Sequence, residues 1–180
     1  EIYTLSLHDA LPILYSFHYD RVKAKYGSSA KLLFTDTDSL CYVIQTKDLY
    51  QDMQQMRDEF DTSNYPKDHP LYSKDNAKVL GKMKDELASV PGLEFVGLRP
   101  KMYSLLAMNN IQKKTAKGVS RHVIKKHLQH TDYKQVLEQG SQTLSEMNRI
   151  RAYNHQLYTE KIRKVSLSAF DTKRYVLADG

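Results

Sequence analysis

The feature that most constrains the fold is a pair of short apolar runs separated by the acidic tetrapeptide Asp36–Ser39, whose sequence is DTDS. The runs Leu32–Phe34 and Leu40–Ile44 are rich in β-branched and aromatic residues, which predicts two buried strands joined by a polar turn. Two carboxylates at such a turn can converge on one divalent cation, and Mg²⁺ prefers hard oxygen ligands of this kind. The sequence therefore predicts a β-hairpin with a candidate metal site at its tip. The alternative is purely structural, because Asp favours turns.

Residues 1–13, with the sequence EIYTLSLHDALPI, look like a reading frame through a widely used sequencing-library adapter. We therefore exclude them from fold reasoning and expect the authentic chain to start near Leu14. The alternative is a short amphipathic segment that carries Leu5, Leu7 and Leu11.

Composition places the chain among globular proteins with a basic balance. Of the 180 residues, 41% are apolar and 27% are charged, and the formal net charge is +6. Without residues 1–13 the charge is +8, because 27 basic residues then face 19 acidic ones. The single cysteine, Cys41, fits an intracellular, reducing compartment, and no apolar run approaches the ~18 residues of a membrane span. We expect a polyanionic partner and no membrane.

Periodicity predicts an α+β arrangement. A boundary near residue 108 is expected to separate a sheet-bearing half, 14–108, from a basic and mainly helical half, 109–180. The last forty residues show no clear pattern. We predict helices over 14–26, 47–59, 115–128 and 132–139, the last with Thr131 as N-cap and Gly140 as stop, a loop over 61–77, and strands over 79–86, 93–98 and 102–108.

The segment from Arg99 to Leu128 contains eight Lys or Arg residues and no Asp or Glu. Such a run is typical of a surface that contacts phosphates, although a solvated helix face is the ordinary alternative. On the helix predicted there, four of these residues would form one stripe. The stripe consists of Lys114, Lys117, Arg121 and Lys125, and the other cations expected to contact nucleic acid are Arg99, Lys101 and Lys113.

Lys101 and Tyr103 are two residues apart on a predicted strand, so they would share one face and could grip the same sugar-phosphate chain. The other polar groups do not predict a metal or catalytic site. The pair Asp85-Glu86 is most simply a solvated strand end, and His127 and His130 lack the further ligands of a zinc set.

Together these motifs resemble family B DNA polymerases, most closely the protein-primed branch of viruses, linear plasmids and large DNA transposons. Motif C of that family has an aromatic residue, any residue and then Asp-Thr-Asp-Ser, which Phe34–Ser39 matches with Phe in place of the usual Tyr. The downstream Lys-x-Tyr motif matches Lys101–Tyr103, and the Lys-rich thumb stretch resembles the segment that ends at Lys126. The resemblance covers about residues 14–180.

This resemblance implies a palm fragment, 14–108, followed by a thumb and C-terminal tail, 109–180. It implies that Asp38 binds both catalytic Mg²⁺ (or Mn²⁺) ions, with Asp36 close by and more indirect, and that Lys101 and Tyr103 hold the primer terminus. The implied partners are primer-template DNA, deoxynucleoside triphosphates and a terminal priming protein. The implied activity is two-metal nucleotidyl transfer to a primer 3′ end.

The chain departs from the family pattern because motif A, the fingers motif and the exonuclease cannot be found in it. One hairpin would bind two metals poorly, so we expect the chain alone to be inactive. A second hypothesis is a non-enzymatic DNA-binding module with a vestigial Asp pair. A third is a phosphatase of the haloacid-dehalogenase type, which the Leu at position 40 and the lack of a following Lys and acidic cluster disfavour.

Overall fold

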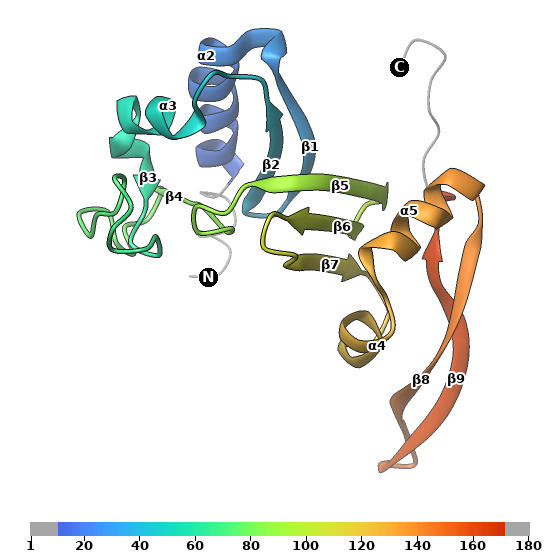
Figure 1. Cartoon of the computed structure of the whole chain (residues 1–180). Helices are drawn as coiled ribbons and strands as arrows, with labels where there is room; N and C mark the ends of the chain where they lie inside the picture. The colour runs from blue at the N-terminus through green and yellow to red at the C-terminus, as the bar shows by residue number, and fades with distance from the viewer. Residues whose placement is uncertain (1–10, 172–180) are drawn as a thin grey trace. The chain divides into compact units, whose positions relative to one another are not determined.

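The computed structural model describes residues 11–171, and these divide into two compact units. Unit 1 extends through Ser89 and unit 2 begins at Val90, and each is described by itself below. The expected boundary near residue 108 is wrong, because that position falls between two hydrogen-bonded neighbouring strands of one sheet. Both units mix helices and strands, so the α+β prediction is confirmed (Figure 1).

Unit 1 begins with the predicted helix. Residues 11–16 are α-helical, the helix continues as the π-helix η1 (Phe17–Lys23) and α2 (Ala24–Tyr26), and a short turn of 3₁₀-helix, η2 (Gly27–Ser29), follows. The helix includes residues 11–13 of the adapter-like segment, whereas residues 1–10 lie outside the described part of the chain. Gly27 ends the helix with φ +54°, a backbone conformation that glycine adopts without a steric penalty.

The predicted hairpin follows as the antiparallel strands β1 (Ala30–Asp36) and β2 (Ser39–Ile44). A register shift between Leu32 and Phe34 leaves a bulge, and pairing resumes up to the Asp36–Ser39 pair at the turn. The expectation of buried strands is wrong, because Ala30 is the only residue of the two strands that is fully buried.

The second predicted helix is present as α3 (Leu49–Gln55), which Asp48 caps by accepting hydrogen bonds from the amides of Tyr50 and Gln51, with η3 (Arg57–Glu59) after it. A loop then connects β3 (Phe60–Asp61) to β4 (Met83–Lys84), and these two-residue strands pair in parallel. The predicted strand over 79–86 is wrong. Gly81 at φ +83° and Lys78 at φ +61° bend the chain into turns and leave only β4 extended.

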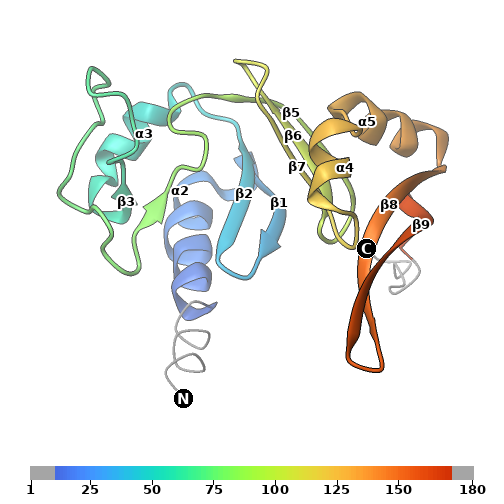
Figure 2. The same ribbon diagram turned by 90° about the horizontal axis from the view of Figure 1, so that it is seen from below.

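Unit 2 is built on the antiparallel sheet of β5 (Gly92–Arg99), β6 (Met102–Ala107) and β7 (Gln112–Ala116). The helices α4 (Arg121–Lys126) and α5 (His130–Gln139) follow, and a long hairpin of β8 (Gln142–Tyr153) and β9 (Gln156–Ser168) extends beyond them (Figures 1 and 2). One core joins all of these elements, and its most buried side chains are Met102, Tyr133, Val136 and Leu167.

Two predictions for this unit fail. The helix expected over 115–128 is strand β7 up to Ala116, then a turn at Gly118, and then the short helix α4, which begins only after Ser120. Ser120 is its N-cap and accepts a hydrogen bond from the Val123 amide (3.3 Å). The expectation of a mainly helical second half is also wrong, since β7, β8 and β9 contain more residues than α4 and α5.

The helix predicted over 132–139 is confirmed as α5. Gly140 ends it in the left-handed conformation, as predicted, but the N-cap is Gln129 rather than Thr131. The amide of Gln129 donates to Asp132 Oδ2 (2.7 Å), which completes a capping box.

Candidate functional site: the Asp-Thr-Asp turn and the basic face of unit 2

Asp36 and Asp38 stand at the tip of the β1–β2 hairpin. Asp36 is the last residue of β1, Thr37 and Asp38 form the two-residue turn, and Ser39 opens β2. The Asp38 amide donates to the Asp36 carbonyl (2.6 Å), and Ser39 Oγ donates to the same carbonyl (3.1 Å). The turn is therefore closed by its own backbone, which leaves the Asp38 side chain exposed and Asp36 half-buried.

Thr37 makes this turn strained. Its φ is +55°, although a two-residue hairpin turn with positive φ at this place normally holds glycine, and a β-branched residue is a true outlier there. The Thr37 hydroxyl donates to Asp36 Oδ1 (3.3 Å), so the strained residue also contacts one of the two carboxylates. Strain of this kind costs on the order of 1–3 kcal/mol and is characteristic of functional sites.

The donor set of the turn suits a hard divalent cation, because carboxylate oxygens are the ligands that Mg²⁺ and Mn²⁺ take most readily. The set is small. Among residues 11–171 no group of three or more His, Cys, Asp or Glu side chains is arranged to hold a metal ion. Asp36 and Asp38 are thus at most part of a site.

A shallow groove beside the turn is lined by Leu14 and His18 from the first helix and by Leu32, Thr35 and Thr37 from the hairpin. His18 Nδ1 lies 2.8 Å from the Tyr42 hydroxyl, and the two rings stack with centroids 5.8 Å apart. Burial raises the pKa of Tyr42 to about 12, so its hydroxyl keeps its proton at neutral pH. This contact fixes the helix on the hairpin that presents the two aspartates.

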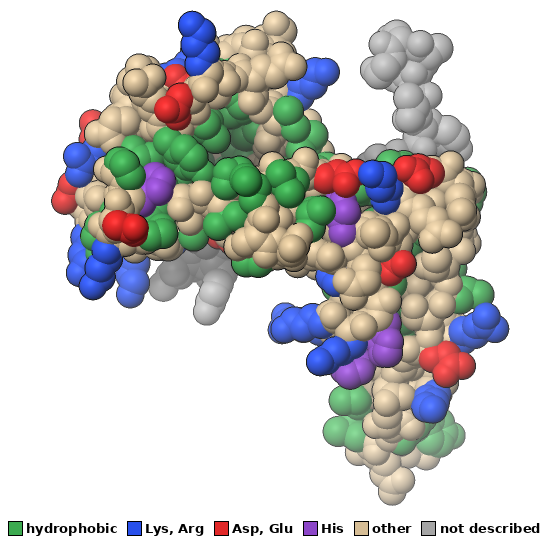
Figure 3. Space-filling view, viewed as in Figure 1, with side chains coloured by type: hydrophobic (Ala, Val, Ile, Leu, Met, Phe, Trp, Pro, Cys, Tyr) green, Lys and Arg blue, Asp and Glu red, His purple; other side chains and the backbone are tan. Residues whose placement is uncertain are grey.

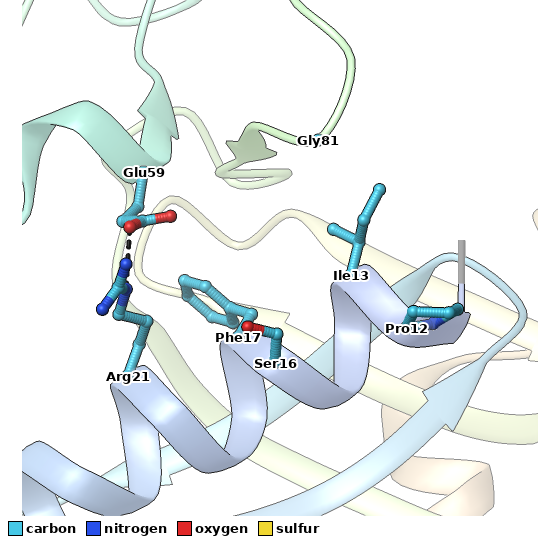
Figure 4. A pocket seen from close by; sticks show the side chains of 7 residues that line it. All are labelled: Pro12, Ile13, Ser16, Phe17, Arg21, Glu59 and Gly81. Carbon is cyan, nitrogen blue, oxygen red and sulfur yellow. Dashed lines mark hydrogen bonds and ion pairs between the residues drawn. The ribbon is translucent and has the colours of Figure 1, made fainter. Parts of the chain in front are cut away.

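Figure 4 shows a second, more open hollow of unit 1, where Phe17 and the Arg21–Glu59 ion pair (2.7 Å) face Gly81. One wall is formed by Pro12 and Ile13, which belong to the segment that we expect to derive from an adapter. We therefore assign no function to this hollow.

In unit 2, Arg99 ends β5, and Lys101 lies in the turn to β6 with φ +60°. Strand alternation therefore does not apply to Lys101, and the expectation that it shares a strand face with Tyr103 is wrong. Tyr103 lies on β6 opposite Gly97 of β5 and Thr115 of β7.

Tyr103 pairs with Thr115 of β7, and Lys113 lies two residues before Thr115 on the same strand. Lys113 and Tyr103 therefore share one sheet face, which is the face opposite α5. The rings of Phe95 and Tyr103 lie 5.8 Å apart on this face. A Cβ at Gly97 would lie 3.0 Å from the Phe95 ring, so the ring covers that position. The structure thus brings Tyr103 and Lys113 to one surface.

The predicted four-residue basic stripe is wrong, because its members lie on a strand, a turn and a short helix. Lys117 is in the turn, and Arg121 and Lys125 are one helical turn apart on α4, all three exposed. Lys114 points inward from β7. Its ammonium donates to the Leu128 carbonyl, and burial lowers its pKa. Lys114 therefore stabilises the connection between α4 and α5.

Charge is distributed unequally between the two units. Within the described residues, unit 1 has 11 Lys or Arg and 12 Asp or Glu, whereas unit 2 has 14 Lys or Arg and 6 Asp or Glu. Five of the basic residues of unit 2 lie on the β8–β9 hairpin, whose outer half is almost entirely exposed. Figure 3 shows Lys and Arg side chains on the visible face of unit 2. The sequence reading missed this hairpin as a basic surface. The five residues are Arg149, Arg151, Lys161, Arg163 and Lys164.

A buried polar network in unit 2 was also not predicted from the sequence. His130 Nδ1 lies 2.8 Å from the fully buried Ser104 Oγ, and His130 Nε2 faces Glu94 Oε2 at 3.4 Å. Lys134 pairs with the other oxygen of Glu94 (2.7 Å). Because Ser104 has no exposed surface, we interpret this network as the attachment of α5 to β5 and β6.

Comparisons with known proteins give no family. No family model matches the chain, and searches of curated proteins and of solved structures return no significant match. Within the described residues, no helix is both long and apolar enough to cross a membrane.

Proposed function

We propose that this chain belongs to a metal-dependent nucleotidyltransferase that extends DNA. Within that class, we propose the C-terminal palm and thumb region of a family B DNA polymerase of the protein-primed type. The observation that carries the proposal is the strained turn of the β1–β2 hairpin, which presents Asp36 and Asp38 with Thr37 between them. A turn whose only purpose was to reverse the chain would gain stability from Gly or Asn at position 37.

In this proposal Asp38, the exposed carboxylate of the pair, holds the metal ions, and Asp36 acts close by and more indirectly. Mg²⁺ or Mn²⁺, when bound, would activate the primer 3′ hydroxyl and neutralise charge on the leaving pyrophosphate. Thr37 and the Ser39 hydroxyl hold the turn in shape through their contacts with Asp36. A pair of carboxylates on one hairpin is too small a donor set for two metals, so the chain alone should not polymerise DNA.

Unit 2 supplies the surface for primer-template DNA in the same proposal. Its excess of basic residues would bind phosphates without reading the base sequence. Tyr103 and Lys113, which share one sheet face, would contact the primer strand, and Lys101 lies in the turn that precedes β6. Deoxynucleoside triphosphates and a terminal priming protein would be partners of the complete polymerase.

The second candidate is a DNA-binding module without catalysis, and the distribution of charge favours it. The basic excess lies in unit 2, whereas the Asp pair lies in unit 1. The nucleotide sequence upstream of codon 14 separates the two candidates. An in-frame motif of the form Asp-x-x-Ser-Leu-Tyr-Pro supports the polymerase, and its absence from a fully recovered gene supports the module.

The DNA part of the proposal is tested by titrating a labelled duplex with the 180-residue chain at several salt concentrations. We expect weak binding that does not depend on sequence and falls as salt rises. The triple variant Lys117→Gln, Arg121→Gln and Lys125→Gln should lower the slope of log affinity against log salt by about 2 to 3, at about 0.9 per lost phosphate contact.

The matched control removes the same charge from exposed positions of unit 1, as Lys23→Gln, Lys31→Gln and Lys47→Gln. Binding that does not depend on salt, or equal losses in the two triple variants, would refute the assignment of the DNA surface to unit 2.

A further inference from the structure

Residues 76–84 of unit 1, here called the lysine loop, form two successive turns, which β4 follows at the end of the segment. The first turn is closed by a hydrogen bond from the Val79 amide to the Asn76 carbonyl (3.2 Å), and the second by one from Lys82 to Val79 (3.4 Å). The third residue of each turn has positive φ, Lys78 at +61° and Gly81 at +83°, as a type II turn requires. The loop therefore has a defined backbone shape.

Buried contacts hold the base of the lysine loop in place. The carboxylate of Asp61, which is 5% exposed, accepts hydrogen bonds at Oδ2 from the Lys78 amide (3.2 Å) and from Lys84 Nζ (3.4 Å). The Asn76 side-chain amide donates to the Phe60 carbonyl (2.9 Å). These contacts, together with the pairing of β3 with β4, fix both ends of the loop to the same strand.

The tip of the loop faces outward with an apolar residue between two lysines. Leu80 is 95% exposed, and Val79 beside it is 47% exposed. The backbone on both sides of Leu80 is anchored by the contacts above. The conformation of the loop therefore holds the Leu80 side chain in an exposed position. Lys78 precedes this pair and Lys82 follows it.

The lysine loop itself carries only positive charge, and two acids that contact it or flank it are in ion pairs with cations. The lysine loop contains no Asp or Glu. Asp75, just before it, pairs with Arg57 (2.8 Å), and Asp85, just after it, accepts hydrogen bonds from Tyr65 and from backbone amides. Asp61 is paired with Lys84. Within residues 11–171 no ion pair joins Lys78 or Lys82 to an acid.

We propose that the lysine loop is a nucleic-acid contact of unit 1, in which Lys78 and Lys82 bind backbone phosphates and Leu80 packs against a sugar or a base edge. Ammonium groups on either side of an apolar tip suit a polyanion with apolar surface between its charges, and Leu is among the residues that insert into minor grooves. The inference rests on the proposed function for the identity of the polyanion, DNA. It adds a contact outside the basic surface of unit 2.

A lipid surface has the same charge but fits the loop less well. Stable attachment to anionic membranes requires a cluster of about 4–8 Lys or Arg or a sizeable apolar face. The lysine loop offers two lysines that are not engaged with acids and one fully exposed leucine. We therefore assign DNA and treat lipid as an outcome of the test.

The test compares the double variant Lys78→Gln and Lys82→Gln with the control Lys23→Gln and Lys47→Gln, which removes the same charge from other parts of unit 1. Lys78 and both control lysines are exposed, and Lys82 is half-buried. Gln keeps the backbone amide that Lys78 donates to Asp61. With a labelled DNA duplex at low salt, we expect the loop variant to lose on the order of ten-fold in affinity and about 2 in salt slope. The control should lose less than about two-fold. Leu80→Ser should weaken binding without changing the slope.

Each outcome is decisive. Equal losses in the loop variant and the control would overturn the inference while leaving the proposed function intact. Absence of DNA binding by the unaltered chain would overturn the proposed function and, with it, the inference. Binding of the unaltered chain to phosphatidylserine vesicles that the loop variant loses, with DNA binding unchanged, would reassign the lysine loop to a lipid surface.

Discussion

Asp61 provides the sharpest test of how unit 1 holds its long loop. The carboxylate is almost completely buried, and its oxygens accept hydrogen bonds from the Ser63 amide (3.0 Å), the Lys78 amide (3.2 Å) and Lys84 Nζ (3.4 Å). In Asp61→Asn the one remaining side-chain oxygen can accept a hydrogen bond from only one of the Ser63 and Lys78 amides. The new NH₂ group then faces the other amide, which is also a donor. A hydrogen bond to a charged group contributes about 1.5–3 kcal/mol, and the half-exposed Lys84 adds at most about 1 kcal/mol.

We therefore expect Asp61→Asn to lower the free energy of unfolding of unit 1 by about 2–4 kcal/mol at pH 7. The pH dependence has a defined sign. The hydrogen bond from Ser63, followed by those from Lys78 and Lys84, holds the pKa of Asp61 well below its ordinary value of 3.8. This contribution is fully present above the unfolded-state pKa and is lost as pH falls toward the folded-state pKa. The difference between the two proteins should be constant above about pH 5 and shrink below about pH 4.

The assay is urea unfolding followed by NMR amide signals assigned to unit 1, because tyrosine fluorescence would mix the two units. Asp68→Asn is the matched control, since Asp68 is an exposed carboxylate of the same loop. A loss below about 0.5 kcal/mol, or a difference that grows as pH falls, would refute the role given to Asp61.

Three further predictions concern the β1–β2 turn, the buried network of Ser104 and His130, and the contact between Gly97 and Phe95. Thr37→Asn should stabilise unit 1 by about 1 kcal/mol in the same assay, because Asn tolerates positive φ, and a destabilised variant would show that the turn is not strained. Ser104→Ala should cost unit 2 about 1–3 kcal/mol in urea unfolding, since His130 Nδ1 loses its buried partner, and an unchanged midpoint would contradict this network. Gly97→Ala should displace the Phe95 ring, visible as changed ring-proton shifts, and unaltered shifts would contradict the close approach.

The parts of the fold that the sequence predicted are those with local signals. The β1–β2 hairpin was predictable because its apolar runs flank an acidic turn, and α5 because Gly140 marks its end. The false helix over 115–128 came from apolar spacing alone, which outweighed the turn signal of Gly118 and the cap signal of Ser120. Periodicity cannot reveal a turn that separates a strand from a short helix.

The long β8–β9 hairpin escaped prediction because its outer half has no buried face. Alternation of apolar and polar residues arises only where one face packs against a core, whereas Ile150 and Leu157 at the far end are both more than 70% exposed. The sequence does contain one signal for the turn, because Asn and His are enriched at positive φ, and Asn154 and His155 both adopt positive φ in the structure.

The candidate site was only partly predictable from the sequence. Asp36 and Asp38 are only two residues apart in the chain, so their proximity could be predicted without the fold. The strand register that places Tyr103 and Lys113 on one sheet face, and the hydrogen bond between Lys114 and the Leu128 carbonyl, depend on segments that are distant in the sequence. No local sequence pattern predicts such contacts.

The central claim, that the β1–β2 turn is part of a catalytic metal site, is tested most directly by Mn²⁺ titration of the ¹⁵N-labelled chain. We expect paramagnetic broadening of the amides of residues 36–39, with a dissociation constant of about 1 mM or weaker because few ligands are present. Broadening should disappear in Asp38→Asn and persist in Asp48→Asn, which alters another exposed carboxylate of unit 1. Absence of broadening at the turn, or tight stoichiometric binding there, would contradict the claim.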